Sequence, residues 1–265
     1  MTELILISET ILISTALYAY LHKKTRISLK FLYLDNVAVI LPVATLALWL
    51  QSLGLHIAII MVLLVPGLTP GLAFGYTMIR FWRTPMRRVR AGEDEIISPA
   101  DGNVIYIKKI EAGNVPVSIK NGRAFRLNEL TKTDLLDTPC WLIGINMTPF
   151  DVHKNCSPID GTIVLTEHYN GKFLSLKEAD ALVDNERNTY VIQNKKLKIG
   201  VIQIASRLVR RIDVYVKQEQ EVKRGDWLGM IRFGSQVDVI LPVNYVPVVS
   251  VGQQVYAATS VIAKL

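Results

Sequence analysis

Long apolar runs dominate the first 90 residues of this 265-residue chain. Residues 31–79 contain no Lys or Arg and are rich in Leu, Ile, Val and Ala. A membrane-spanning helix needs about 20 apolar residues, so we predict two spans, roughly residues 37–55 and 57–79. The prolines within them are expected to kink these spans or to break them into a re-entrant pair.

An earlier apolar stretch, residues 4–21, carries Glu9 and several hydroxyl side chains. It fits a third span, an interfacial helix or a signal peptide. Basic residues follow this stretch rather than precede it, which disfavours the signal peptide. We therefore expect residues 1–90 to form an α-helical membrane anchor, with a helix at 4–21 and a hairpin at about 37–79.

The charge of the chain is unevenly distributed. Residues 1–90 hold nine basic and three acidic side chains, whereas the remaining 175 residues hold 21 basic and 20 acidic ones. The basic character therefore belongs to the anchor, and we expect no nucleic-acid partner. Basic clusters flank the predicted hairpin, which places them and the C-terminal domain on the cytoplasmic side of the cell membrane.

From about residue 91 onward, short runs rich in Val, Ile and Tyr alternate with Gly, Pro, Asn and Asp, a pattern typical of strands. We expect residues 91–265 to form a mainly β domain, a compact sandwich or barrel of repeated hairpins. The expected strands are 102–110, 140–147, 161–168, 190–193, 197–205, 211–216, 227–233 and 237–241. Short helical turns are expected at 128–136 and 206–210.

An internal repeat supports this architecture. The pattern Ser-Pro-x-Asp-Gly occurs in ISPADGNVI (97–105) and in CSPIDGTIV (156–164), 59 residues apart. Each copy predicts a turn that leads into a strand. Residues 222–231 and 249–263 share a weaker rhythm of a Val, a Gly turn and an apolar strand.

A Gly-Ser pair, Gly234 and Ser235, lies between two strand-like runs close to the C-terminus. Glycine permits strained backbone geometry in a tight connection, so the peptide bond between these residues is a candidate for attack by the serine itself. The simpler alternative for such a pair is a hairpin turn.

His153 is one of four histidines, and it alone directly follows a predicted strand and precedes the second repeat copy. A serine hydroxyl is a poor nucleophile until an imidazole accepts its proton. Ser235, His153 and Asp101 are therefore the candidate nucleophile, base and orienting carboxylate. Asp160 holds the same repeat position as Asp101, and Asp151 is a further candidate orienter. An ordinary core or surface histidine is the alternative for His153.

Other chemistries find little support. The sequence contains no GxSxG elbow, HExxH, CxxC, phosphate loop or dinucleotide fingerprint. We expect no metal site, because few histidines occur in the β-rich part. Cys140 and Cys156 are expected to be free thiols.

Six motifs occur in order along the chain, each weak alone and specific together: RFWRTP (80–85), EIISPADG (95–102), MTPFDVHKN (147–155), DNERN (184–188), QIASRLVRRI (203–212) and GMIRFGSQVDVILP (229–242). On these motifs the chain resembles the short, membrane-anchored phosphatidylserine decarboxylase proenzymes, over essentially all of residues 80–265. The family's arginine-aromatic motif usually carries an acid where Thr84 stands here. Phe150 replaces a second histidine of longer relatives, so one imidazole would serve both self-cleavage and decarboxylation.

The resemblance implies that the proenzyme cleaves itself between Gly234 and Ser235, and that Ser235 becomes a covalent pyruvoyl group. The products would be chains of 234 and 31 residues that remain associated. The pyruvoyl carbonyl would form a Schiff base with phosphatidylserine, which loses carbon dioxide to give phosphatidylethanolamine. His153 would donate the replacing proton. The lipid backbone, glycerol ester or archaeal ether, stays open, as does the oligomeric state, with a homo-oligomer among the options.

Two other functions compete. A membrane-anchored, lipoyl-like β-hairpin adaptor or carrier would explain the rhythm of residues 222–263, but it needs a lysine at a hairpin tip and none occurs between Asp226 and Ala263. A β-rich metallopeptidase would need more histidines than this domain offers.

Overall fold

The computed structural model describes residues 1–25, 29–111, 114–115, 125–136, 139–172, 174, 181–205, 211–232 and 235–265. The chain divides into two compact units, Met1–Phe81 and Trp82–Leu265. Nine residues of the anchor expected at 1–90 thus lie in the second unit. The expected turn at 206–210 and Gly234 lie outside the described residues.

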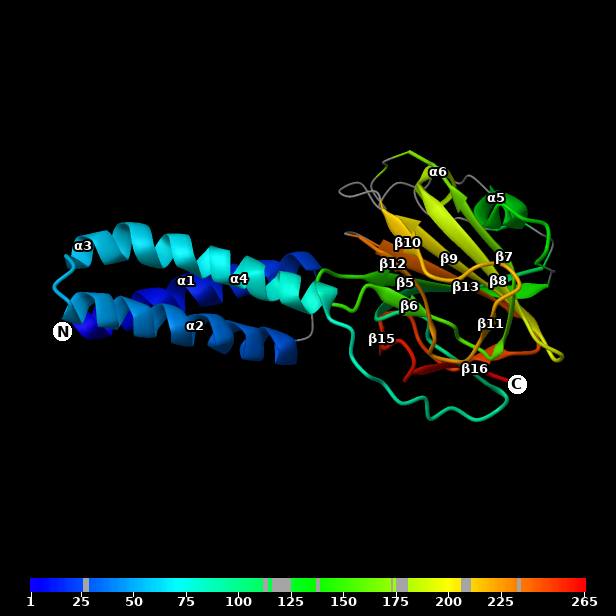
Figure 1. Ribbon diagram of the computed structural model, residues 1–265, viewed down its shortest axis with the longest axis horizontal. Helices are drawn as coiled ribbons and strands as arrows, with labels where there is room; N and C mark the ends of the chain where they lie inside the picture. The colour runs from blue at the N-terminus through cyan, green and yellow to red at the C-terminus, as the bar shows by residue number, and fades with distance from the viewer. Residues whose placement is uncertain are drawn as a thin grey trace. The chain divides into compact units, whose positions relative to one another are not determined.

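The first unit is helical, as predicted (Figure 1). Its elements are α1 (Thr2–Thr25), α2 (Leu29–Ser52), α3 (Ile57–Ile59), the π-helical turn η1 (Ile60–Leu64) and α4 (Val65–Trp82). Within the described residues, three stretches are long and apolar enough to cross a membrane: Thr2–Lys23, Tyr33–Ser52 and Ile57–Trp82. The early apolar run is therefore as suitable a span as the two predicted ones.

Prolines do not interrupt these helices. Pro42 lies inside α2 and Pro70 inside α4. The π-helical turn Ile60–Leu64 ends just before Pro66, and such a turn locally relaxes the hydrogen-bond ladder that a proline cannot join. The stretch 57–82 consequently stays helical, without the break considered above.

Polar side chains join the helices of this unit. Arg80 on α4 forms an ion pair with Asp35 on α2 at 2.5 Å, and Asp35 is 1% exposed. Ser14 donates to Asn36 at 2.5 Å, which ties α1 to α2. In the hydrocarbon core of a membrane such contacts hold helices together, because no water is present there to hydrogen-bond the polar groups instead.

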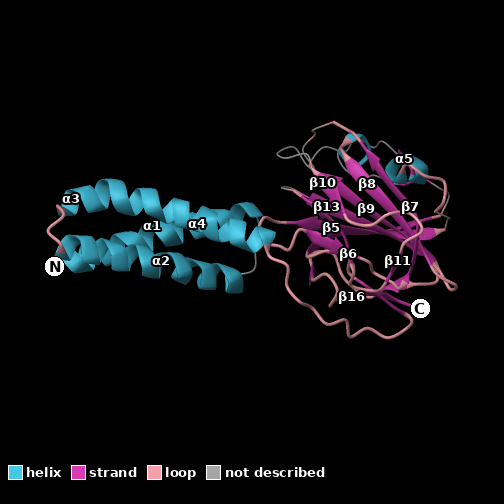
Figure 2. Ribbon diagram, in the orientation of Figure 1, coloured by secondary structure: helices cyan, strands magenta, loops and turns pink. Residues whose placement is uncertain are grey.

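The second unit is built on an eight-stranded antiparallel sheet with the order β11-β7-β8-β9-β13-β5-β2-β15 (Figures 1 and 2). In chain order these strands are β2 (Gly102–Ile110), β5 (Cys140–Met147), β7 (Gly161–Tyr169), β8 (Arg187–Gln193), β9 (Lys198–Ala205), β11 (Glu221–Val222), β13 (Ser235–Pro242) and β15 (Gln254–Val255). The prediction of a mainly β unit is confirmed, and β2 and β5 have the predicted bounds.

Smaller sheets complete the unit, with the orders β1-β16-β14, β10-β12-β6 and β3-β4. Their strands are β1 (Glu95–Ile97), β3 (Asn114–Val115), β4 (Phe125–Arg126), β6 (Lys154–Cys156), β10 (Ile212–Val214), β12 (Trp227–Ile231), β14 (Val246–Pro247) and β16 (Val261–Lys264). The short helices are α5 (Leu127–Thr131) and α6 (Ala181–Asp184).

The large sheet buries both faces. Alternation along β13 sends Ser235, Val237 and Val239 to one face, which we call the inner face, and Gln236 and Asp238 to the other, the outer face. The inner face belongs to the core that includes Ile96 of β1, Leu228 of β12 and Ile262 of β16. The outer face packs with Leu127 and Leu130 of α5. Because such a strand is buried on both sides, its sequence is the nearly continuous apolar run noted above.

The two repeat copies lie against each other. The amide of Ile97 donates to the carbonyl of Pro158 at 3.3 Å, and the amide of Cys156 donates to the carbonyl of Pro99 at 2.9 Å. The serine of each copy caps its own turn at 2.7 Å, Ser98 through the Ala100 carbonyl and Ser157 through the Ile159 carbonyl. The repeated sequence thus forms a repeated, cross-bonded turn.

Candidate active site

Ser235 is the first residue of β13, the strand between β9 and β5. It lies opposite Ala205 on one side and Met147 on the other. Its side chain is 1% exposed, and its Oγ has no hydrogen-bond partner among the described residues. A buried hydroxyl without an acceptor is costly and unusual, so this atom is a candidate for chemistry rather than for packing.

His153 is completely buried just before β6. Its Nδ1 lies 2.9 Å from the carbonyl oxygen of Asp151. A carbonyl can only accept, so Nδ1 carries the hydrogen and the lone pair of the neutral ring is at Nε2. Burial, ahead of all other influences, lowers the pKa of His153 to about 4. The imidazole is therefore neutral near pH 7 and can accept a proton.

The chain brings His153 and Ser235 to one region. Ile231 donates its amide to the His153 carbonyl at 3.1 Å, and Ile231 precedes Ser235 by four residues. Four residues span at most about 15 Å. The start of β13 therefore lies within about 15 Å of Ile231, the residue that contacts His153.

A buried polar network links the same region from the interior. Asn155 of β6, two residues after His153, places its Nδ2 3.7 Å from the sulfur of Met147. Gln203 donates to the Asn155 side chain at 2.8 Å, and Tyr190 donates to Gln203 at 2.8 Å. Because Met147 is the ladder partner of Ser235, this network reaches the start of β13.

Asp101 is 1% exposed and contacts the segment that carries His153. Both of its carboxylate oxygens bind the Arg87 guanidinium, and they also accept from the amides of Ala257 at 2.8 Å and Val152 at 3.3 Å. The Val152 contact fixes the backbone directly before His153. The carboxylate charge also raises the pKa of the imidazole, against the larger effect of burial.

The other candidate carboxylates have different partners. Asp151 accepts from the amide and hydroxyl of Thr148, at 2.7 and 2.8 Å, and from Gln254 at 3.1 Å. Its carbonyl, not its carboxylate, meets His153. Asp160 is exposed and paired with Arg224 at 3.2 Å. The repeat therefore places its two aspartates in unequal surroundings, and only Asp101 lies near the histidine.

A second buried cluster lies on the outer face directly after Ser235. Tyr106 donates to the Asp238 carboxylate, with both oxygens at 2.7 Å, and Gln236 donates to Tyr106 and to Asp238, each at 2.7 Å. A Cβ at position 144 would lie 2.4 Å from the Tyr106 ring, so glycine is required there. Burial raises the pKa of Asp238 to about 6.

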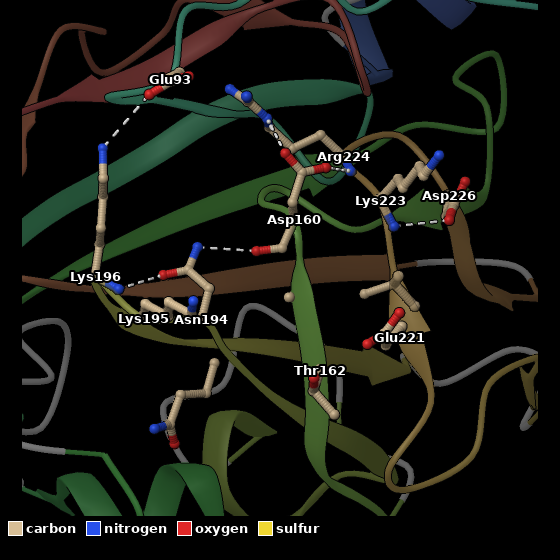
Figure 3. Close-up of a pocket in the computed structure, with 13 residues that line it drawn as sticks. Glu93, Asp160, Thr162, Asn194, Lys195, Lys196, Glu221, Lys223, Arg224 and Asp226 are labelled. Carbon is tan, nitrogen blue, oxygen red and sulfur yellow. Dashed lines mark hydrogen bonds and ion pairs between the residues drawn. The ribbon is translucent and has the colours of Figure 1, made fainter.

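A groove of about 900 Å³ lies elsewhere (Figure 3). It is lined by Gly161 at the start of β7 and Gln193 at the end of β8, whereas the neighbours of Ser235 lie by the start of β8. Six residues of strand, about 20 Å, separate the two ends. Four acidic and four basic residues line the groove, and ion pairs such as Arg224–Asp160 cross it (Figure 3). This groove therefore lies apart from the candidate site around Ser235.

Comparison with known sequences decides the family. The sequence model of the phosphatidylserine decarboxylase family matches residues 74–263. The chain belongs to this family. A relative from Burkholderia ambifaria, named a phosphatidylserine decarboxylase proenzyme, is 33% identical over 189 residues, which cover 71% of this chain and 78% of the relative.

Archaeal relatives match as well. A Methanocaldococcus jannaschii protein, provisionally named an archaetidylserine decarboxylase proenzyme, is 40% identical over 185 residues, covering 70% of this chain and 88% of the relative. A Methanothermobacter thermautotrophicus protein with the same provisional name is 38% identical over 187 residues, covering 71% of this chain and 80% of the relative. Membership in the decarboxylase family supports an enzyme over the lipoyl-like carrier.

Sequence reasoning missed several residues around the site of this decarboxylase family member. In the sequence, Arg87 is one of the basic residues of a cluster expected to set the membrane topology. In the structure, its guanidinium donates to the Asp101 carboxylate. Gln203 and Asn155 lie in the QIASRLVRRI and MTPFDVHKN motifs without signalling their contact. The one signal in the sequence was that these side chains are polar, because polar side chains inside an apolar strand pattern need buried hydrogen-bond partners.

Proposed function

We propose that the chain is a phosphatidylserine decarboxylase that matures by cutting itself between Gly234 and Ser235. The observation that supports this proposal most directly is the buried Ser235 hydroxyl, which has no acceptor among the described residues. It lies in the same interior as the neutral His153 ring. Family membership supports the reaction class, and the relatives' names supply the serine phospholipid as substrate.

The first proposed step is an acyl shift. The Ser235 hydroxyl gives its proton to Nε2 of His153, and Oγ attacks the carbonyl carbon of Gly234. The carbon–nitrogen bond breaks, its nitrogen takes the proton, and an ester joins Gly234 to the Oγ of Ser235. Arg87 and Asp101 position the base by holding the backbone at Val152.

The second step is an elimination. A base removes the Cα proton of residue 235, the Cα–Cβ double bond forms, and the Cβ–Oγ bond breaks, so the upstream chain leaves with a carboxylate at Gly234. The remaining dehydroalanine takes up one water and loses ammonia, which leaves a pyruvoyl group at the start of β13. The Ser235 environment fits this group, because the buried hydroxyl that must leave is not engaged by any described residue.

The pyruvoyl carbonyl supplies an electrophile that no side chain carries, able to capture the substrate amine and to take up the electrons left by carbon dioxide. The protein's residues bind and orient the lipid and control protons. We assign to His153 the transfer of the proton that replaces the carboxylate: Nε2 accepts a proton from the ammonium group of the substrate and then delivers it to the carbon that carbon dioxide leaves. Burial of this ring keeps bulk water from the reacting carbon.

We also propose that the three apolar helical stretches anchor the protein in the cell membrane, with the second unit on the cytoplasmic side. The basic residues Arg83 to Arg90, directly after the last stretch, support this orientation. Protease added outside intact cells should leave the second unit uncut, and digestion there would reverse the proposed orientation.

The decisive experiment compares the parent with Ser235→Ala and with Ser250→Ala, an exposed serine of the same C-terminal segment. Mass spectrometry should find a fragment of about 31 residues with a blocked, pyruvoyl start in the parent and in Ser250→Ala, and an uncut chain in Ser235→Ala. Carbon dioxide release from phosphatidylserine should follow the same pattern. An uncut parent chain that retains its serine would refute the proposal.

A further inference from the structure

One short segment contacts Asp101 and the chain shortly before His153 and Ser235. Residues 82–90, which we call the connecting segment, begin at the last residue of the apolar stretch Ile57–Trp82 and lead toward β1. From position 83 onward the segment has no helix or strand, and its side chains alternate between partly buried and exposed. Such alternation is typical of an extended chain with every second side chain turned inward.

Arg83 holds the turn before His153. Its Nη1 donates to the carbonyl of Phe150 at 2.9 Å. The next carbonyl along the chain, that of Asp151, accepts from Nδ1 of His153 at 2.9 Å. Peptide groups are planar, and one Cα joins each to the next, so a fixed Phe150 carbonyl restricts the orientation of the carbonyl that binds the ring. Arg83 therefore acts on the imidazole through the backbone.

Arg87 holds a second point of the same backbone. Its Nη2 lies 2.7 Å from one oxygen of the Asp101 carboxylate, and this oxygen also accepts from the Val152 amide at 3.3 Å. Arg83 and Arg87 are four residues apart, about 13 Å in an extended chain, and both belong to its partly buried side. The connecting segment thus fixes the backbone before His153 at two places.

Trp82 contacts the chain shortly before Ser235. The Arg232 guanidinium lies 5.3 Å from the centre of the Trp82 ring, within the range of a cation–π contact. Arg232 also binds the Asp213 carboxylate through Nε and Nη2, each at 2.8 Å, and its amide donates to the Arg211 carbonyl at 2.9 Å. Ser235 follows Arg232 by three residues, at most about 10 Å. Arg232 is therefore held by side chain and main chain just before the bond that is proposed to break.

Self-cleavage depends on such restraint. The hydroxyl must meet the carbonyl carbon while the imidazole accepts its proton, and a misplacement of about 1 Å can slow a reaction about a hundredfold. Ser235 itself is fixed by its pairing with Ala205 and Met147. Fixed residues on both sides of a short connection reduce the number of conformations that it can adopt.

We propose that Trp82 and Arg83 are positioning residues for self-cleavage: Arg83 orients the segment that carries His153, and Trp82 holds Arg232 next to the bond that breaks. This inference rests on the proposed function, because it assigns both residues to a cut before Ser235. The chain then passes directly from its last apolar stretch into the supports of the active site.

Arg83 also acts on His153 through its charge. Burial is the largest influence on the pKa of His153, and among the charged groups Asp101 raises this pKa and Arg83 lowers it. Loss of the Arg83 charge should therefore raise the pKa of the ring. A general loss of stability would not produce this shift, so it distinguishes positioning of the histidine from ordinary packing.

The test follows self-cleavage of the freshly synthesised full chain, made by cell-free translation into detergent, as a function of pH. Arg83→Gln should cut about tenfold more slowly at neutral pH, the usual value of a hydrogen bond from a charged group. Its decline at low pH should begin at a higher pH than in the parent. Arg83→Lys keeps a charged donor and should recover most of the rate. Arg88→Gln, at an exposed arginine of the same segment, should match the parent.

Trp82 is tested in the same time courses. Trp82→Leu should slow the cut about threefold, in the range of a partly exposed cation–π contact. Trp82→Phe keeps an aromatic ring and should cut at nearly the parent rate, as should Trp49→Leu, at an exposed tryptophan of α2. The parent rate in Arg83→Gln or in Trp82→Leu would overturn the role of that residue. A slower cut in Arg83→Gln with an unchanged low-pH decline would also overturn the role of Arg83.

A titration of His153 separates this inference from the proposed function. NMR of the uncut Ser235→Ala chain with isotope-labelled histidine can follow this ring, identified by the signal that His153→Gln loses. Added Arg83→Gln should make the ring take up its proton at a higher pH, and added Arg88→Gln should not. This shift would uphold the coupling of Arg83 to His153 even if the parent chain never cut itself, in which case only the proposed function would fail. An unshifted signal in Arg83→Gln would overturn the assignment of Arg83.

Discussion

The Nδ1 atom of His153 donates to the carbonyl oxygen of Asp151, two residues earlier, at 2.9 Å. This short-range bond to a carbonyl, which can only accept, fixes the tautomer of the ring. The Asp101 carboxylate, expected as the orienting group, binds Arg87 and the Val152 amide. The role of Asp101 as a positioning residue stays a proposal, and it acts through the backbone that carries the histidine.

The buried histidine predicts a pH dependence of stability. Its pKa is about 4 when folded and about 6.5 in the unfolded chain. Between these values the unfolded chain binds more protons, so stability is full above pH 6.5 and is lost as the pH falls toward 4. The loss amounts to about 3 kcal/mol.

Urea unfolding at pH 7 and pH 4.5, in the uncut Ser235→Ala background, measures this slope. A His153→Gln variant should lack this part of the pH dependence, and His168→Gln, at a partly exposed histidine, serves as its control. Equal slopes with and without His153 would show that the ring is not buried in its neutral form.

Self-cleavage should follow the same titration. Because Nε2 accepts a proton only in the neutral ring, the cleavage rate should stay nearly level from pH 8 to about pH 5 and fall only as the pH approaches 4. Time courses of fragment appearance on a gel check this profile. A midpoint near 6.5 would indicate a solvated histidine.

Removing Arg87 should damage both folding and maturation. Arg87→Ala leaves the buried Asp101 with two amide donors and no counter-charge, which typically costs about 3–5 kcal/mol. We expect a lower unfolding midpoint and slow cleavage, because the 151–153 segment loses its anchor. The neighbouring Arg88 is exposed, so Arg88→Ala should match the parent in both measurements, and parity of Arg87→Ala with it would contradict the positioning role.

Gly229 is predicted to be irreplaceable. A Cβ there would lie 2.5 Å from the Asp213 carbonyl and 2.6 Å from the Tyr190 hydroxyl, so Gly229→Ala must push apart β10, β12 and the network of Gln203 and Asn155. Overpacking of this kind costs about 1–3 kcal/mol, and thermal unfolding measures it. In Gly92→Ala the nearest contacts are 3.8 Å away, and a similar loss in both variants would disprove the steric argument.

Asp238 should destabilise the fold at neutral pH. Its pKa is about 6 when folded, against the unpaired value of about 3.9, so stability is full below the lower value and declines as the pH rises through 6. Asp238→Asn keeps an acceptor for Tyr106 and should raise the unfolding midpoint at pH 7.5 but not at pH 4. Asp226→Asn, in the exposed groove, should shift neither midpoint, and a loss of stability in Asp238→Asn at pH 7.5 would mean that the charge is needed.

Sequence patterns predicted the framework better than the site. The apolar runs of β2 and β5 ended at clear turn residues, and their bounds were found. The first residues of β8, Arg187 to Thr189, were missed because they are polar, and only tertiary burial makes them a strand. The helix expected at 128–136 occupies Leu127–Thr131, since Lys132 leaves the right-handed region.

The site depended on contacts that no single sequence encodes. Asp101 and Asp160 have the same local sequence context. Their surroundings differ because Asp101 binds Arg87, whereas Asp160 binds Arg224. These arginines come from segments 137 positions apart in the chain. Hydrophobic periodicity carries no information about such pairings.

The position of β13 has a kinetic consequence. The proposed 31-residue product would supply β13 between β9 and β5, β15 beside β2, and β16 beside β1. Its strands would therefore pair with strands of the 234-residue product in two different sheets. Folding of the uncut precursor is a first-order event, whereas reassembly of two separated pieces would be second-order and sensitive to dilution. Maturation would then make unfolding effectively irreversible on dilution, because a molecule that has been cut and later unfolds cannot refold in a unimolecular step.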